Sequence, residues 1–336
     1  MATVTGALRR QILAPALDEV GAVRRGFPLP PGTRPRPDLE SVARAVICGF
    51  EWGIDGARLP ELDLRVALVD PALQGFAYEG VTMALTILDR MPRGGDRVRT
   101  LLTGDAGRHL FLAYIGIGFA MARLPRPLWK DVVPDLPASP FHPVMSWLAV
   151  DGYGFDRAFF ETDRVVGRQR REPGYPWDGD AGYFQRVCDQ GIGRALWFIH
   201  GGRVDDVAGA VGGFAAGRRS DLWGGVGLAA CFAGGADAPA LTSLQQQAGP
   251  DAAQLAVGAV FAATARSYSG LVPDSSARSV AALTGLDVAA AHQLGLDTRP
   301  GDSSPVGVGR PLYEQWRQTI AGRWQALTGE RAGAPA

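Results

Sequence analysis

The chain has 336 residues, of which 34 are basic and 34 acidic, so its formal net charge is zero. With 46% hydrophobic residues it can bury a large core, which excludes a wholly disordered chain. The neutral balance argues against a nucleic-acid binder that relies on a strong overall basic field, but it leaves local basic patches open.

The sequence gives no sign of a metal site or a disulfide framework. The three cysteines, Cys48, Cys188 and Cys231, lie far apart, and the four histidines are scattered without an HxxxH pair. The first 25 residues lack the apolar core of a secretory signal, and residues 109–122 hold about 13 apolar residues where a membrane span needs roughly 20. We therefore expect a soluble, cytoplasmic protein with no bound metal and no membrane span.

Predicted helices follow one another along the chain at a near-constant interval. After a helix over residues 40–52, a short motif of Gly, a mostly apolar residue, two variable residues and Ala returns six times, with glycines spaced by 36, 38, 37, 34 and 33 residues. The copies begin at Gly80, Gly116, Gly154, Gly191, Gly225 and Gly258. Because residues four apart share a helix face, each copy predicts a helix that a neighbouring helix can approach closely.

Helix-start signals and intervening segments extend this pattern. Asp70-Pro71, Asp105 and Asp180 lie ten or eleven residues before a repeated glycine, and Ser220-Asp221 is a further start signal. Residues 97–103, 204–214 and 240–248 carry helical patterns of their own. Two helices per 33–38 residues predict an all-α fold, a helical-hairpin superhelix of the α-solenoid type.

The sequence favours one repeat domain over residues 1–328. N-terminal helices over residues 1–60 precede repeats over about 61–284, and a C-terminal cap covers 285–328, with a helix over 313–327. Residues 329–336 are expected to be a disordered tail. Gly225-x-Gly227-x-x-Ala also fits the dinucleotide fingerprint, but that motif needs a preceding strand, so we interpret it as helix packing and expect no cofactor.

The role of the charged and aromatic residues near the repeated glycines has two interpretations. Acidic residues such as Glu79, Asp151 and Asp189, with arginines such as Arg123 and Arg194, form either internal ion pairs or the polar lining of a concave surface. The aromatic residues of the middle third are either core or the wall of a groove for an extended apolar ligand. The arginines of residues 164–171 either interact favourably with the negative end of a helix dipole or dock an acidic partner such as an acyl carrier protein.

Several longer strings resemble the DUF1702 family, also described as UnbL-like proteins. They include RGF at residues 25–27, FAYEG at 76–80, GIGFAMARLPRPLW at 116–129, DGYGFDRAFFETDR at 151–164, YPW at 175–177, DQGIGRALWF at 189–198 and DLWGGVGLAACFAGGAD at 221–237. The resemblance covers roughly residues 7–325. It implies a role in antibiotic biosynthesis, in forming or maturing an enediyne core beside the polyketide synthase that makes a linear polyene. It supplies no catalytic residues.

Two hypotheses on function follow. In the first, an accessory protein or enzyme of enediyne core biosynthesis acts on or binds the polyene or its carrier-bound form. In the second, a non-catalytic helical-repeat scaffold binds the polyketide synthase or another pathway protein. Whether the protein is an enzyme stays open.

Equivalent offsets from the repeated glycines predict one site. Three carboxylates are the candidates for acid–base work, and five further residues are candidates for substrate binding. The carboxylates are Glu79, Asp151 and Asp189, and the others are Tyr78, Arg123, Tyr153, Arg194 and Trp197.

Overall fold

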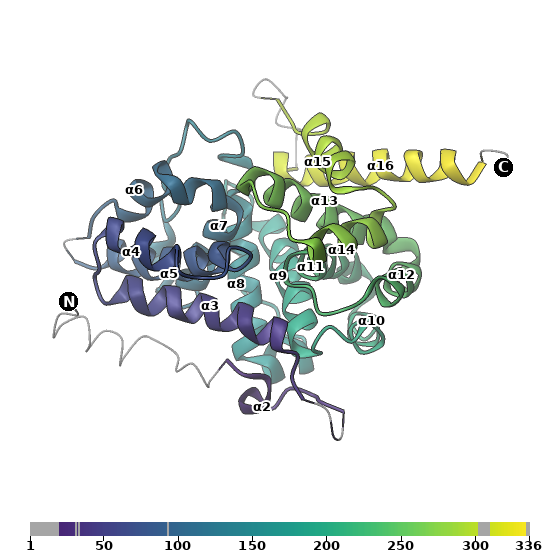
Figure 1. The fold of residues 1–336 in the computed structure, drawn as a ribbon, viewed down its shortest axis with the longest axis horizontal. Helices are drawn as coiled ribbons and strands as arrows, with labels where there is room; N and C mark the ends of the chain where they lie inside the picture. Colours follow the sequence, from purple (N-terminus) through teal and green to yellow (C-terminus); the bar gives the residue numbers. More distant parts are fainter. Residues whose placement is uncertain (1–19, 31, 33, 93, 302–309, 334–336) are drawn as a thin grey trace. The chain divides into compact units, whose positions relative to one another are not determined.

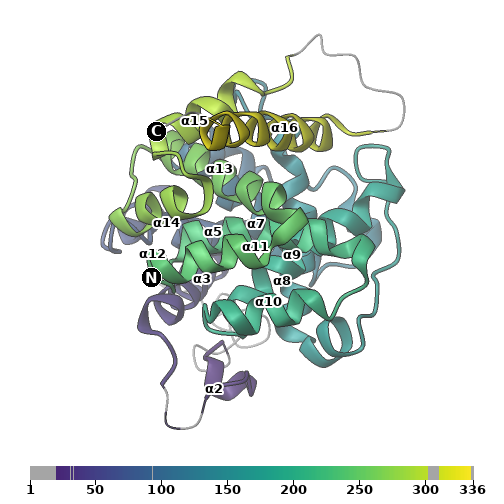
Figure 2. The same cartoon turned by 90° about the vertical axis from the view of Figure 1, so that its right-hand side faces the viewer.

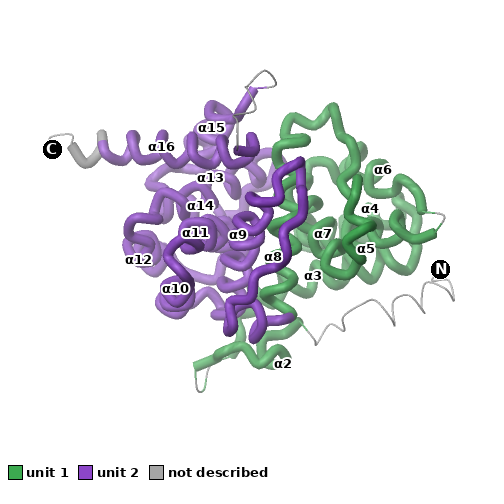
Figure 3. The backbone as a smooth tube through the Cα atoms, turned by 180° about the vertical axis from the view of Figure 1, so that it is seen from behind, with its two compact units in different colours: residues 1–160 green, residues 161–336 purple. Residues whose placement is uncertain are grey.

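A computed structural model describes residues 20–333 except 31, 33, 93 and 302–309, and within these residues the protein is helical and has no strands (Figure 1). The all-α prediction is confirmed. The contacts divide the chain into two compact units, residues 1–160 and 161–336 (Figure 3). The sequence predicts a single domain over residues 1–328. Whether the two units form one domain depends on how they are joined, so this stays a prediction.

In unit 1, four long inner helices pack against one another in chain order: α3 on α5, α5 on α7, and α7 on α8. Shorter helices connect the first three, and a long segment with two 3₁₀ turns but no α-helix connects α7 to α8. The helices are α2 (Ala22–Arg25), α3 (Pro37–Ile54), α4 (Leu59–Val66), α5 (Gln74–Arg90), α6 (Arg97–Thr103), α7 (Leu110–Met121) and α8 (Leu148–Phe160). The 3₁₀ turns are η1 (Asp105–His109), η2 (Arg126–Trp129) and η3 (Val144–Trp147).

Unit 2 has a more regular alternation of inner and outer helices. The inner helices α9 (Ala181–Ile199), α11 (Ala216–Ala233) and α13 (Ala252–Ser269) pack in chain order, as Figures 1 and 2 show. The outer helices α10 (Val204–Gly212), α12 (Ala238–Gln247) and α14 (Asp274–Thr284) follow the same order. The remaining elements are η4 (Asp163–Gly167, a π-helical turn), η5 (Gly249–Asp251), α15 (Val288–Asp297) and α16 (Leu312–Gly333).

Each repeated glycine lies within an inner helix, as predicted, and most form what we call glycine seams. In a seam, a glycine lies so close to the neighbouring helix that an added Cβ would fall within 3.0 Å of a backbone carbonyl oxygen. Such an approach brings the helix axes together and allows Cα–H···O contacts. The described seam glycines are Gly49 and Gly80 (α3/α5), Gly116 (α5/α7), Gly118 and Gly152 (α7/α8), Gly193 and Gly225 (α9/α11), and Gly227 and Gly258 (α11/α13).

The glycine seams explain why glycines stand two residues apart in the Gly-x-Gly sequences of α7 and α11. Residues two apart on an α-helix point about 200° apart. Accordingly, Gly116 of α7 faces α5 while Gly118 faces α8, and Gly225 of α11 faces α9 while Gly227 faces α13. One helix can thus pack closely against both of its neighbours. The interpretation of residues 225–230 as helix packing is confirmed.

The start signals had mixed outcomes. Asp180 caps α9, since its side chain accepts a hydrogen bond from the Tyr183 backbone N–H at 2.8 Å. Asp70 instead forms a turn before α5, which begins at Gln74. Ser220-Asp221 was wrong as a start, because α11 begins at Ala216 and buries Asp221 within the helix.

The C-terminal capping helix is present as α16, which packs on α13 and α15. It extends to Gly333, beyond the expected end at residue 327 and into the segment expected to be disordered; residues 334–336 lie outside the described part of the chain.

Candidate functional site

The two candidate carboxylates of unit 1 are buried. Glu79 lies on α5, one residue before Gly80, with 3% of its surface exposed, and Asp151 lies on α8 with 1% exposed. The Glu79 carbonyl oxygen is also the atom against which Gly116 packs in the α5/α7 seam. A reactant could reach these carboxylates only if the helices around them moved. Their catalytic role stays a prediction.

The two predicted tyrosines are packing residues in this structure. The Tyr78 hydroxyl donates a hydrogen bond to Asp63 Oδ1 at 2.9 Å, and the Tyr78 ring stacks on His109 at 5.3 Å. Burial and then the Asp63 carboxylate raise the pKa of Tyr78 well above its usual value, so the hydroxyl remains protonated. The Tyr153 ring meets Trp129 edge-on at 4.9 Å. Both rings stabilise unit 1.

Arg123 lies in a group of rings and charges at the C-terminal end of α8. It pairs with Asp156, donates to the Phe119 carbonyl at 3.0 Å and lies 5.2 Å from the Phe160 ring centre. Arg25 approaches the same helix end and donates to the carbonyls of Phe159 and Phe160, each at 2.8 Å. We call Arg25, Phe27, Arg123, Asp156, Phe159 and Phe160 the arginine–aromatic cluster.

This cluster explains the RGF string at residues 25–27. Arg25 supplies a cation and donors to carbonyls that a helix C-terminus leaves without intrahelical partners. Gly26 has φ of 67°, the left-handed conformation that ends α2, and Phe27 then packs edge-on against Phe159 at 5.0 Å. The sequence marked these residues only through the family resemblance. Their spatial partners lie more than 130 residues away.

In unit 2, Asp189 forms a bidentate ion pair with Arg218. Arg218 Nε donates to Oδ2 at 3.0 Å and Nη2 to Oδ1 at 2.6 Å, and Gln185 adds a hydrogen bond at 3.2 Å. Burial raises the pKa of Asp189, and the Arg218 guanidinium opposes that rise. Both carboxylate oxygens are occupied. One alternative from the sequence pairs Arg123 and Arg194 with Glu79, Asp151 and Asp189, whereas in the structure Arg123 pairs with Asp156 and Asp189 with Arg218.

The other two predicted residues of unit 2 lie inside it. Arg194 of α9 is 7% exposed. Trp197 has no exposed surface, and its indole N–H donates to the Gly234 carbonyl at 2.8 Å. Five of the eight predicted residues therefore belong to unit 1 and three to unit 2. That all eight line one site stays a prediction.

Unit 2 also contains a buried ionic network that the sequence did not predict. Its centre is Arg317 of α16, which is 1% exposed. Arg317 Nη1 donates to Asp221 Oδ1 at 2.7 Å and to Glu314 Oε2 at 3.2 Å, and Nη2 donates to Gln254 Oε1 at 3.0 Å. The Tyr183 hydroxyl donates to the same Glu314 oxygen at 2.6 Å. The network thus joins α16 to α9, α11 and α13.

A second arginine completes the charge balance. Arg186 donates to Asp221 Oδ2 at 2.8 Å and lies 2.8 Å from Glu314, so two guanidiniums face two carboxylates. Burial acts to raise the pKa of Asp221, but Arg317 and Arg186 outweigh it and hold that pKa below its usual value. Gly224 leaves room for the guanidinium, because a Cβ there would lie 2.7 Å from Arg317 Nη2. The network is a closed structural element with every charge matched.

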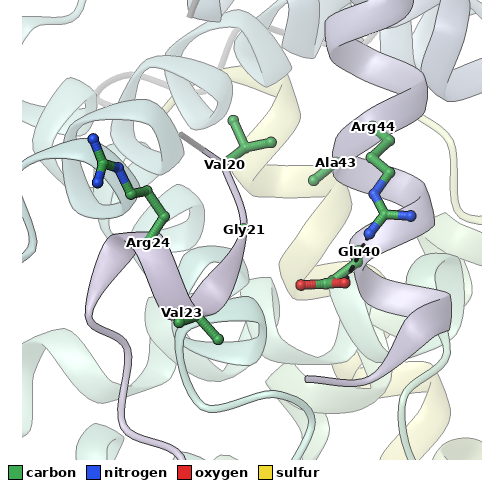
Figure 4. Close-up of a pocket in the computed structure, with 7 residues that line it drawn as sticks. All are labelled: Val20, Gly21, Val23, Arg24, Glu40, Ala43 and Arg44. Atoms are coloured by element: carbon green, nitrogen blue, oxygen red, sulfur yellow. Dashed lines mark hydrogen bonds and ion pairs between the residues drawn. The ribbon is translucent and has the colours of Figure 1, made fainter. Parts of the chain in front are cut away.

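An open groove lies between α2 and α3 in unit 1 (Figure 4). It encloses about 330 Å³ and combines apolar side chains with two arginines on different helices. Arg44 is paired with Glu40 at 3.0 Å, and the exposed Arg24 is a further cation at the rim. None of the eight predicted residues lines it. Its lining is Val20, Gly21, Val23, Arg24, Glu40, Ala43 and Arg44.

The described residues contain no group of three or more His, Cys, Asp or Glu side chains arranged to hold a metal ion. None of the helices in this part of the chain has the length and apolar character needed to span a bilayer.

Among the described residues, fold and site together define an all-helical protein in which inner helices meet at glycine seams and several charged side chains, such as Asp189 and Arg218, are buried as ion pairs. A family model described as Protein of unknown function (DUF1702) matches residues 4–324, and the chain belongs to this family. Searches of curated proteins and of solved structures found no matching protein.

Proposed function

We propose that the protein is an accessory binding protein of enediyne core biosynthesis, which holds a polyene intermediate or its carrier-bound form. The family resemblance supports the pathway, and the groove between α2 and α3 is the observation that supports binding. Ligand pockets combine mainly apolar walls with a few polar anchors and enclose roughly 300–1,000 Å³. At about 330 Å³ this groove falls within that range. We propose that it works in the cytoplasm, where its free cysteines would stay reduced.

The chemistry of the groove fits a conjugated chain with an anionic end. Val20, Val23 and Ala43 offer an apolar surface for the chain, whose transfer out of water is favourable. Arg24 and Arg44 at the rim can pair with a carboxylate or with the phosphate of a carrier arm, since guanidinium forks match both groups.

The state of the candidate carboxylates favours binding over acid–base chemistry. A general base must come within hydrogen-bond reach of the proton it removes. Both oxygens of Asp189 are engaged by Arg218, and Glu79 and Asp151 are buried in helix interiors.

The alternative function is a scaffold for the polyketide synthase or another pathway protein. The order of helix contacts within each unit supports it, because inner helices pack in chain order and the outer helices of unit 2 do the same. We infer that the helices within each unit stack as the hairpins of an α-solenoid do, and stacked helical hairpins of this kind often bind protein partners.

Fluorescence of a conjugated tetraene fatty acid tests the binding proposal, because its emission rises when the chain leaves water. We expect saturable binding in the micromolar range that weakens about fivefold or more in Val23→Asp and in Arg24→Glu. Val23 is exposed, so the charge should leave folding intact. Leu68→Asp is the matched control, since Leu68 is exposed in the same unit away from the groove lining. Equal binding by all four proteins would refute the groove as the site.

Deletion of the gene followed by metabolite profiling tests the pathway role. We expect loss of the enediyne and restoration by the wild-type gene but not by Val23→Asp. Asp151→Asn and Arg194→Gln separate an enzyme from a binding protein. Lost output with an unchanged melting temperature in either would support the predicted catalytic site. Unchanged enediyne production in the deletion strain would reject both functions.

A further inference from the structure

An exposed loop in unit 2 carries several arginines directly after the π-helical turn η4. We call residues Arg168–Arg171, with the sequence Arg-Gln-Arg-Arg, the basic loop. Arg168, Arg170 and Arg171 are all exposed. Nothing in the groove between α2 and α3 involves this loop.

The charges of the basic loop are only partly neutralised. Arg164, just before it, pairs with Glu161 and Glu172, and Arg168 pairs with Asp163 at 2.9 Å. No acidic side chain of the described residues pairs with Arg170 or Arg171. Two neighbouring guanidiniums therefore face solvent with all their donors available.

The backbone of the loop is held in a fixed and uncommon conformation. Gln169 has φ of 50°, the left-handed region that residues other than glycine rarely adopt. Its side-chain amide donates to the Gly213 carbonyl at 2.8 Å. The Arg170 backbone N–H donates to the Arg164 carbonyl at 3.0 Å, which curls the chain before the two free arginines.

The buried Asp189–Arg218 pair anchors this conformation from inside the unit. Arg218 Nη1 donates to the Gln169 carbonyl at 3.3 Å, while its other nitrogens hold Asp189. A strained residue persists only where its surroundings over-determine it, and such residues concentrate at functional positions. The candidate carboxylate Asp189 therefore connects to the surface through Arg218 and Gln169.

We propose that the basic loop is a docking surface for the acidic face of a partner protein, with Asp189 and Arg218 as positioning residues. The partner is a protein because Glu161, Asp163 and Glu172 neutralise the neighbouring arginines and leave only Arg170 and Arg171 for a partner. Two adjacent cations are too few to follow the continuous phosphates of a nucleic acid, whereas spaced carboxylates can face them individually. A pre-set loop loses less conformational entropy on binding than a mobile one. The identity of the partner rests on the proposed function: if that function holds, the partner is the domain that carries the polyene.

Fluorescence anisotropy with the full chain tests the surface directly. The probe is a fluorescein-labelled helical peptide of about 15 residues with Glu side chains four apart on one face. At about 150 mM salt we expect saturable binding that weakens about five- to tenfold in the Arg170→Gln/Arg171→Gln variant. Arg278→Gln/Arg323→Gln is the matched control, because it removes the same charge from two exposed positions elsewhere in unit 2. An equal loss of peptide affinity in both variants would show that only the net charge of the protein matters and would overturn the proposal.

Two further measurements test positioning and partner class. Gln169→Gly keeps the backbone conformation and every charge but removes the bond to Gly213, and we expect about two- to fivefold weaker peptide binding. Wild-type affinity in this variant would overturn the positioning role.

A duplex DNA of equal charge that bound as tightly as the peptide would overturn the choice of a protein partner. Tetraene binding should be unchanged in Arg170→Gln/Arg171→Gln, so failure of the groove and failure of the basic loop give different results.

Discussion

Units 1 and 2 share one packing device and differ in how they accommodate charge. In both, inner helices meet at glycine seams, as Gly116 does in unit 1 and Gly225 in unit 2. In unit 1 arginines cap helix ends and lie over phenylalanine rings, and Arg266 of unit 2 does the same at Phe232, near the end of α11. Unit 2 also contains a network in which Arg317, Asp221 and Glu314 are buried and the partly exposed Arg186 completes the charge balance.

The difference shows that backbone geometry and side-chain pairing impose separate requirements. A seam needs only a small residue at the correct position of each helix, so it can recur with the helix. A buried charge needs a specific partner at hydrogen-bond distance, because an unpaired ion in a low-dielectric interior is strongly unfavourable. Unit 2 meets the second requirement with a network that joins four helices, which depends on the tertiary structure of the whole unit.

The largest expected effect comes from removing the central cation of unit 2. Arg317→Met leaves Asp221 and Glu314 facing each other with only Arg186 between them, and we expect unit 2 to lose about 3–5 kcal/mol of unfolding free energy. Hydrogen exchange resolved by peptide measures this locally, through faster exchange in α9, α11 and α16.

Arg323→Gln is the control, since Arg323 is exposed on the same helix and should change unfolding free energy little. Exchange in α3, α5 and α7 should stay at wild-type rates in Arg317→Met. If Arg317→Met accelerated hydrogen exchange equally in both units, the network would stabilise unit 1 as well as unit 2. The contrast drawn between the two units would then be wrong.

The glycine seams should respond alike in both units. In Gly116→Ala and in Gly225→Ala the new Cβ would overlap a backbone carbonyl oxygen of the adjacent helix, of Glu79 and Gln190 respectively. The helices must then separate, and we expect each variant to lose about 1–3 kcal/mol or more. Thermal or urea denaturation provides the measurement.

Gly209→Ala is the matched substitution outside a seam. Gly209 lies within α10 with nothing within 4 Å of an added Cβ, so alanine should stabilise the helix by about 0.5–1 kcal/mol. A gain at Gly209 with losses at both seam positions would confirm the comparison. A loss at only one seam position would limit the packing device to one unit.

The smallest effect is a pH dependence in unit 1 that originates at His142. Its Nδ1 lies 2.9 Å from the Tyr114 hydroxyl and its Nε2 3.3 Å from Asp135, and burial lowers its pKa below 6.5 despite the Asp135 carboxylate. The unfolded chain therefore takes up a proton before the folded one does, and unit 1 should lose stability as pH falls below about 6.5, by at most ~1.4 kcal/mol per pH unit. Urea denaturation of wild type and His142→Gln at about pH 7 and pH 5.5 checks this, since the substitution should reduce the slope, while His200 and His292 of unit 2, whose pKa values are also lowered by burial, retain their share. The same slope in both proteins would contradict the assignment to His142.

The seams could be anticipated because their information is local. Gly80, Gly116, Gly225 and Gly258 recur at the helical repeat length, and glycine and alanine four apart predict a close approach on one helix face. Asp180 as a helix cap was predictable for the same reason, since the hydrogen bond it makes spans three residues. Patterns whose partners lie within one or two turns are visible in the chain itself.

The charged interior could not be anticipated. The sequence pattern predicts a helix start at Ser220-Asp221, yet Asp221 lies within α11 and pairs with Arg317, which is 96 residues away in the chain. Asp189 could have met any of several arginines, and only the packing of α9 on α11 selected Arg218.

The helical class, the spacing of the inner helices and several of the places where backbones touch can thus be predicted from the chain alone, because helix periodicity and residue size act over a few residues. Which charges meet and which surfaces stay open depends on the packed structure. An ion pair depends on distance in space, and two side chains far apart in the chain become neighbours only when every helix between them has packed.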